Sequence, residues 1–192
     1  GNLGVASYGI VANIALVGVS VFVGIAQGMQ PLVSYGYGLQ DTMVLKKVLK
    51  YALIASLSIA SVMYLGMFFI VNFIVGIFNS DGNFEIARMA KEGLIIYFIG
   101  FFFAGINIIM IMYLSASEYA KEAFAISMAR GCVIIVPMVF LLSSIWEMTG
   151  VWLAFVATEC IVTIISVWMV ANSRKIEDHQ EKMSISIPEE SC

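Results

Sequence analysis

Charged residues divide this chain into long apolar stretches. Asp, Glu, Lys and Arg are absent from residues 1–40, 51–80 and 93–117. Each of these stretches exceeds the roughly 20 residues that cross a bilayer core of about 30 Å. Two further apolar stretches each hold a single central charge, Arg130 in one and Glu159 in the other. The pattern predicts five transmembrane helices, near residues 7–33, 47–77, 87–114, 119–145 and 149–172.

Composition supports this interpretation. Of the 192 residues, 61% are hydrophobic and 12% are charged, whereas about 25% of residues are charged in a soluble domain. The sequence therefore predicts an all-α, polytopic membrane protein with one transmembrane lobe over residues 1–172. Hydropathy drops abruptly after that point, so we expect residues 173–192 to form a solvated, largely disordered tail in which His179 has no function.

Lysine and arginine are distributed unevenly between the two predicted faces of the membrane. One face carries Arg88 and Lys91, and the other carries seven basic residues, namely Lys46, Lys47, Lys50, Lys121, Arg174, Lys175 and Lys182. Basic residues concentrate on the cytoplasmic side of membrane proteins. We therefore expect a plasma-membrane protein with Gly1 outside and the C-terminus in the cytoplasm. The chain begins with Gly1 rather than Met and has no basic segment typical of a signal peptide, so we expect it to be a piece of a longer protein.

The first predicted span contains two amides close to a proline. Pro31 has no N–H, so the Gln27 carbonyl loses its helical partner and the helix is free to bend. Gln27 and Gln30 lie three residues apart and share a face with that carbonyl. The amides either bond to a neighbouring helix or line a solute path. Gly24 and Gly28, like Gly100 and Ala104, lie four residues apart, and such pairs of small residues favour close helix packing.

Charges within spans are costly and therefore informative. Arg130 lies about 10 Å from the inner face and Glu159 about 14 Å from the outer face, at 1.5 Å per residue. Because consecutive spans joined by a short turn are antiparallel, the two heights differ by only about 6 Å. The two residues can form a structural ion pair, reach toward the interface separately, or act as a proton- or cation-linked switch.

Three other residues within the predicted spans could bend a helix or supply a polar group. Pro137 follows Arg130 by seven residues and predicts a second bend, with the Val133 carbonyl freed. Asn13 and Asn107 are single amides within spans, which either bond between helices or contact a solute.

Motifs of several other functional classes are absent from the sequence. There is no HExxH, GxSxG or P-loop motif, no aspartate-rich diphosphate motif, and no histidine in the spans, so an enzyme is disfavoured. Cys132, Cys160 and Cys192 have no metal-binding or disulfide spacing. We expect no cofactor, no metal and no nucleic-acid partner.

Four segments of the chain carry a family resemblance. The first span contains "VASYGIVANI" and "VGIAQGMQPLVSYGYG", and three later segments read "GINIIMIMYLSASEYAKEA", "ARGCVIIVPMVFLL" and "GVWLAFVATE". These segments resemble the eighth, tenth, eleventh and twelfth of the twelve helices of the multidrug and toxic compound extrusion (MATE) transporters. The resemblance covers residues 5–172 and implies helices eight to twelve of a C-terminal lobe.

This resemblance also implies a function. The family exports amphipathic or cationic drugs by alternating access in exchange for Na⁺ or H⁺, using an N-terminal lobe as well as this one. Candidate pathway residues are then Gln27, Gln30, Asn107 and Glu159, although the tenth-helix segment lacks the acid that some members carry there. The alternatives are a flippase for lipid-linked oligosaccharides, which needs more basic span residues than Arg130, and a non-transporting membrane subunit.

Overall fold

The chain folds entirely into helices in the residues that the structure describes. The computed structural model describes the backbone of residues 2–79 and 82–186, and side chains as far as Ser173. The helices, in chain order, are α1 (Asn2–Gly38), α2 (Thr42–Phe78), α3 (Phe84–Ala116), α4 (Ala120–Met128), the π-helix η1 (Ala129–Val133) and α5 (Ile135–Ser186).

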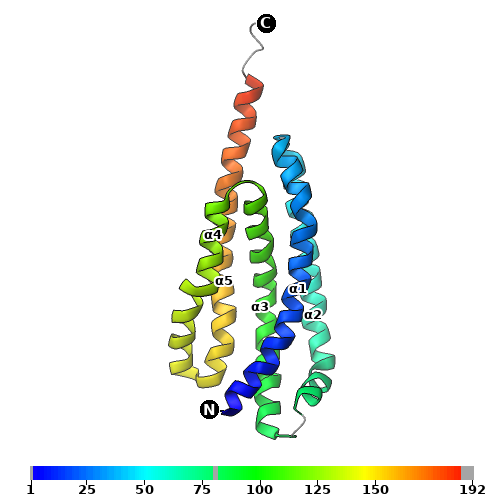
Figure 1. Ribbon diagram of the computed structural model, residues 1–192, viewed down its shortest axis with the longest axis vertical. Coiled ribbons are helices and arrows are strands. Elements are labelled where there is room, and N and C mark those ends of the chain that lie inside the picture. Colours follow the sequence, from blue (N-terminus) through cyan, green and yellow to red (C-terminus); the bar gives the residue numbers. More distant parts are fainter. Residues whose placement is uncertain (1, 80–81, 187–192) are drawn as a thin grey trace.

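The last long element, α5, consists of two helices that run in opposite directions. The backbone leaves helical geometry at Trp146 (φ −122°, ψ 18°) and Glu147 (φ 50°, ψ −123°), and the chain turns back there (Figure 1). Together α4, η1 and the first part of α5 make one span, and the rest of α5 makes another. Four segments of the described chain are long and apolar enough to cross a membrane, where the sequence predicts five, because the last of them, Ala120–Ser173, runs through both antiparallel arms of this hairpin.

The turn within α5 does not obtain its positive φ from a glycine. Glu147, not Gly150, adopts positive φ. Gly150 instead lies against the backbone of Leu142, where an added methyl group would overlap the Leu142 carbonyl. In the turn between α2 and α3, by contrast, the residue with positive φ is a glycine, Gly82, at +64°.

Helix α3 is the centre of the bundle, between α1 and α2 on one side and the two arms of the α4–α5 hairpin on the other (Figure 1). Glycines on α3 allow this close packing. A methyl group on Gly100 would lie 2.5 Å from Phe155 Cε1, and one on Gly93 would lie 2.6 Å from Trp152 Cε2. The predicted contact at Gly100 is therefore present, whereas Gly24 and Gly28 have nothing near them among the described residues.

The C-terminal end differs from the predicted disordered tail. Helix α5 continues through residue 173 and ends at Ser186. Residues 151–187 contain no glycine and no proline. No helix-breaking residue therefore ends α5 at the point where hydropathy drops. The side chain of His179 lies outside the described residues.

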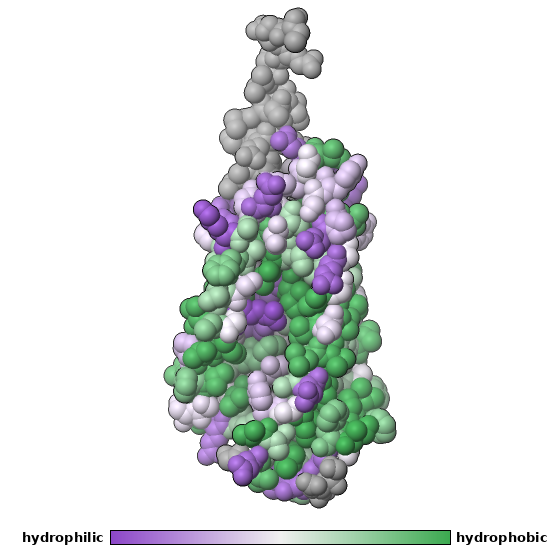
Figure 2. Space-filling model, viewed as in Figure 1, coloured by the Kyte–Doolittle hydropathy of each residue, from purple (hydrophilic) through white to green (hydrophobic). Residues whose placement is uncertain are grey.

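Surface hydropathy matches a membrane-spanning bundle. Hydrophobic residues cover most of the middle of the face shown in Figure 2, and hydrophilic residues gather toward both ends. One strongly hydrophilic spot lies in a hollow at mid-height, surrounded by hydrophobic residues. Charge at that depth is costly in lipid, so the polar residues in this hollow are candidates for a functional role.

Candidate functional site

Arg130 is placed by an irregular segment of helix. Helix α4 gives way to η1, where the Ile134 amide donates to the Ala129 carbonyl, five residues back, at 2.9 Å. Pro137 lies in the first turn of α5, which begins at Ile135, and offers no N–H to the Val133 carbonyl. The irregularity thus lies directly before Pro137, where the sequence predicts a bend, and π-turns of this kind are frequent at functional sites.

Arg130 and Glu159 form an ion pair within the bundle. Arg130 Nε lies 2.6 Å from Glu159 Oε1. The Glu159 side chain is only 2% exposed, whereas the Arg130 side chain is 23% exposed. The structure thus brings together the two charges that depth along the spans predicts to be close, and the arginine is the partner that remains accessible.

Asn107 holds the other oxygen of this carboxylate. Its Nδ2 donates to Glu159 Oε2 at 2.7 Å and to the Glu159 carbonyl at 3.0 Å. Ser166 Oγ donates in turn to Asn107 Oδ1 at 3.0 Å. Both carboxylate oxygens therefore accept hydrogen bonds from donors on other helices, so this network joins α3, η1 and α5 at one point.

Sequence reasoning missed the hydroxyl residues of this network. Thr163 Oγ1 donates to the Glu159 carbonyl at 2.8 Å, and Ser166 reaches Asn107 from one turn further along α5. The signal was their spacing, because residues four and seven positions after Glu159 share its helix face. Serine and threonine are common in membrane helices, so this spacing becomes informative only beside a buried carboxylate.

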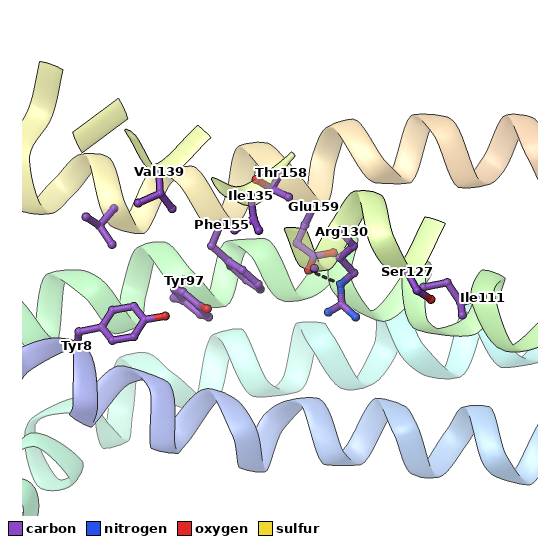
Figure 3. A pocket seen from close by; sticks show the side chains of 12 residues that line it. Tyr8, Tyr97, Ile111, Ser127, Arg130, Ile135, Val139, Phe155, Thr158 and Glu159 are labelled. Atoms are coloured by element: carbon purple, nitrogen blue, oxygen red, sulfur yellow. Dashed lines mark hydrogen bonds and ion pairs between the residues drawn. The ribbon is translucent and has the colours of Figure 1, made fainter. Parts of the chain in front are cut away.

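A cavity of about 360 Å³ adjoins the ion pair (Figure 3). It is lined by residues from α1, α3, α4, η1 and α5, namely Tyr8, Tyr97, Ile111, Ser127, Arg130, Gly131, Ile135, Val139, Val151, Phe155, Thr158 and Glu159. Tyr97 and Phe155 stack with ring centroids 3.8 Å apart and planes 3° apart. Tyr8, which stacks on Trp152, points its hydroxyl toward Tyr97. The cavity therefore has an aromatic end and a charged end.

Other predicted site residues lie away from this cavity. Gln27 and Gln30 are exposed on α1 and make no hydrogen bond within the described part of the chain. Asn13 is also exposed, and its Nδ2 donates to the Gly9 carbonyl of its own helix at 2.8 Å, so its amide joins no neighbouring helix. Helix α1 passes through Pro31 without interruption. The packed face of this part of α1 is formed by other residues, Ala26, Met29 and Val33.

Comparison with known proteins gives consistent matches. The MatE family model matches residues 1–141. The chain is 24% identical over 175 residues to the multidrug export protein MepA of Staphylococcus saprophyticus, covering 88% of this chain and 37% of that protein. It is 26% identical over 179 residues to the MepA of Staphylococcus haemolyticus, covering 91% and 38%.

Two solved structures share the fold. The bent form of the Vibrio cholerae MATE transporter VcmN matches with a TM-score of 0.86 and 15% identity, over 93% of this chain and 40% of that one. An outward-facing multidrug resistance MATE family transporter of the MOP superfamily matches with a TM-score of 0.88 and 14% identity, over the same shares. The chain thus spans well under half the length of the proteins that it matches.

Proposed function

This chain belongs to the MatE family, and from that membership we propose that the protein exports amphipathic or cationic organic compounds by alternating access, in exchange for Na⁺ or H⁺. The name of its MepA relatives, multidrug export protein, supports an export role. The chain covers only 37–38% of those relatives. We therefore propose that it works with the remaining helices of a transporter of their size, including an N-terminal lobe.

One observation carries the proposed mechanism, namely the Arg130–Glu159–Asn107 network beside the cavity. A coupling ion drives transport only if it binds one conformation more tightly than the other. Glu159 is an acid held between donors on two other helices, with Arg130 on one oxygen and Asn107 on the other. A proton or cation that competes for this carboxylate would loosen η1 and α3 from α5, and that change couples ion binding to helix position.

The exposed face of α1 supports a second part of the proposal. Gln27 and Gln30 have no partner among the described residues, and Gly24 and Gly28 leave open space beside them. An amide facing lipid is costly. We therefore assign this face to the contact with the other helices of the transporter, where the amides line the solute path or bond to those helices. We also propose that Gly1 lies outside and the C-terminus in the cytoplasm, because the count of basic residues favours that orientation.

Dye export by the full-length protein tests the proposal. Everted vesicles that contain it should accumulate ethidium when a Na⁺ or H⁺ gradient is present, and accumulation should stop when that gradient is collapsed. The variant Glu159→Gln should weaken the dependence on the gradient. Transport that ignores collapse of both gradients would contradict antiport, and a Glu159→Gln variant that only lowers expression would contradict the role of Glu159.

A further inference from the structure

A second cavity, of about 410 Å³, lies where α2 ends and α3 begins (Figure 1). Arg88 and Lys91, the two basic residues of the predicted outer face, both line it. They lie three residues apart on α3 and so share a helix face. No Asp or Glu is among the described residues that line this cavity. Its described lining is therefore positively charged.

Both cations keep donors that the protein does not use. Lys91 has no partner among the described residues. Arg88 Nη2 donates to Glu85 Oε2 at 3.0 Å, and the two side chains are 56% and 51% exposed. An exposed pair of this kind contributes little, and Nε and Nη1 of Arg88 have no partner in the described structure. These donors match the oxygens of a phosphate group.

The α2 wall of the cavity offers an amide and open space. Asn79 is engaged across the turn, because its Nδ2 donates to the Asn83 carbonyl at 2.9 Å and its Oδ1 accepts from the Asn83 amide at 3.2 Å. Asn72, one face-turn back along α2, is exposed and has no partner among the described residues. Between them, a methyl group added to Gly76 would meet nothing within 4 Å. A ligand in this space can therefore reach the Asn72 amide.

The depth of these groups matches that of lipid headgroups. Helices α2 and α3 have 37 and 33 residues, so they are about 55 and 50 Å long, whereas a bilayer with its headgroups is about 40–45 Å thick. A centred helix therefore extends a few ångströms beyond the headgroups at each end. Asn72 lies about 9 Å from the end of α2, and Arg88 and Lys91 lie about 6 and 10 Å from the start of α3. All three groups thus lie at the level of the headgroups.

Apolar surface adjoins the cavity on α2. Leu65 and Phe69 lie seven and three residues before Asn72, share its helix face, and are 61% and 86% exposed. Phe84, also exposed, lines the cavity itself. A soluble phosphate ester would leave this surface uncovered, whereas the acyl chain of a phospholipid covers it.

We propose that this cavity binds an anionic phospholipid, with the phosphate on Arg88 and Lys91, an ester oxygen on Asn72, and an acyl chain along the exposed face of α2. A zwitterionic lipid brings its own cation to the phosphate, so the positive lining favours a headgroup with net negative charge. Under the proposed orientation this lipid belongs to the outer leaflet. The site does not depend on the export function, because it shares no residue with the buried ion-pair network.

Three probes separate charge, phosphate and chain. They are dioctanoyl phosphatidylglycerol, dioctanoyl phosphatidylcholine, and glycerophosphoglycerol, which is the anionic headgroup without chains. Each is titrated calorimetrically into the purified full-length protein in uncharged detergent micelles. We expect phosphatidylglycerol to bind about tenfold more tightly than phosphatidylcholine, because each basic residue near a membrane surface is worth about fivefold and Glu85 offsets part of the Arg88 charge.

Two results would overturn the proposal at this stage. Equal binding of the two lipids would show that the positive lining selects no headgroup. Binding of glycerophosphoglycerol as tight as that of phosphatidylglycerol would assign the cavity to a soluble phosphate ester instead of a lipid.

A pair of double variants tests the two cations. Arg88→Gln with Lys91→Gln should abolish the preference for phosphatidylglycerol. The matched control, Lys47→Gln with Lys50→Gln, removes two exposed cations with the same spacing at the other end of α2, and should leave the preference intact. Equal losses in the two double variants would show attraction to overall charge, and would overturn the site.

Gly76→Leu tests the cavity without changing any charge. The leucine enters open space, so thermal stability should be unchanged, while phosphatidylglycerol binding should weaken about tenfold. In the control Gly66→Leu, on the same helix, the added side chain also starts in open space but outside this cavity, and affinity should be unchanged. Unchanged affinity in Gly76→Leu would contradict the site. Selective lipid binding by a protein that exports no dye would contradict only the export function.

Discussion

Removing Arg130 from the buried ion pair should destabilise the protein more than removing Glu159 does. In Arg130→Gln the carboxylate of Glu159, which is 2% exposed, keeps only Asn107 as a donor to its oxygens. A buried charge left without its partner costs about 3–5 kcal/mol. In Glu159→Gln the uncompensated charge is that of Arg130, which is 23% exposed and faces the cavity, where water can solvate it. We expect a loss of about 2 kcal/mol there, the worth of one charged hydrogen bond.

The double variant makes this estimate sharper. With both residues as glutamine no buried charge remains, and an amide pair can still form a hydrogen bond. The double variant should therefore lose less than the about 2 kcal/mol expected for Glu159→Gln, which means that it regains more than about 3 kcal/mol of the two summed losses. The attraction itself supports this scale, because two unit charges about 4 Å apart interact by about 4 kcal/mol at an effective dielectric constant of 20.

Denaturation of the full-length protein in mixed detergent micelles, followed by tryptophan fluorescence, measures these differences. The expected order of stability is wild type, then the double variant, then Glu159→Gln, then Arg130→Gln. The matched control is Arg88→Gln, which removes an exposed pair with Glu85 and should change stability by less than about 1 kcal/mol. Additive losses in the double variant, or equal losses in the two single variants, would refute the reasoning.

Three further predictions follow from the same packing and charge distribution. Replacing Asn107 with Leu leaves Glu159 Oε2 without a donor, while Ser166 keeps the Thr163 carbonyl as acceptor, so unfolding measured in micelles should show a loss of about 1–3 kcal/mol, and a loss below about 0.5 kcal/mol would contradict the network. Gly100→Ala should lower the free energy of unfolding by about 1–3 kcal/mol because its methyl group meets the packed ring of Phe155. Gly24→Ala should be neutral or slightly stabilising in the isolated chain. Equal effects of the two substitutions would refute the close packing of α3 at Gly100. In a cysteine-free background, an impermeant maleimide added to intact cells should label a cysteine at position 83 but not one at position 118, and the reverse would invert the proposed orientation.

Sequence sufficed for the helices and for the central charges. Length and hydropathy determine how many spans a chain can make, and a rise of 1.5 Å per residue determines their depths. Those two quantities placed Arg130 and Glu159 at similar heights on neighbouring spans, and the structure pairs them.

Other features depend on how the helices turn about their axes, which no local pattern fixes. Gln27 and Gln30 have the most conspicuous local signal in the chain, yet they face outward in this structure, because Ala26 and Met29 take the packed side of α1. Thr158 has almost no local signal, and it becomes notable only where α5 meets a cavity. Whether a polar residue belongs to a site therefore depends on which side of its helix packs against the bundle, and not on its residue type.

Transport by the double variant Arg130→Gln with Glu159→Gln tests the central claim most directly. This variant has no unpaired buried charge, so a loss of activity cannot be ascribed to the instability of a single variant. Gradient-driven ethidium export, measured in proteoliposomes and divided by the amount of folded protein, should fall at least about tenfold relative to wild type if the pair couples ion binding to helix position. Export per folded molecule equal to wild type would show that the pair only holds the helices together, and would contradict the account.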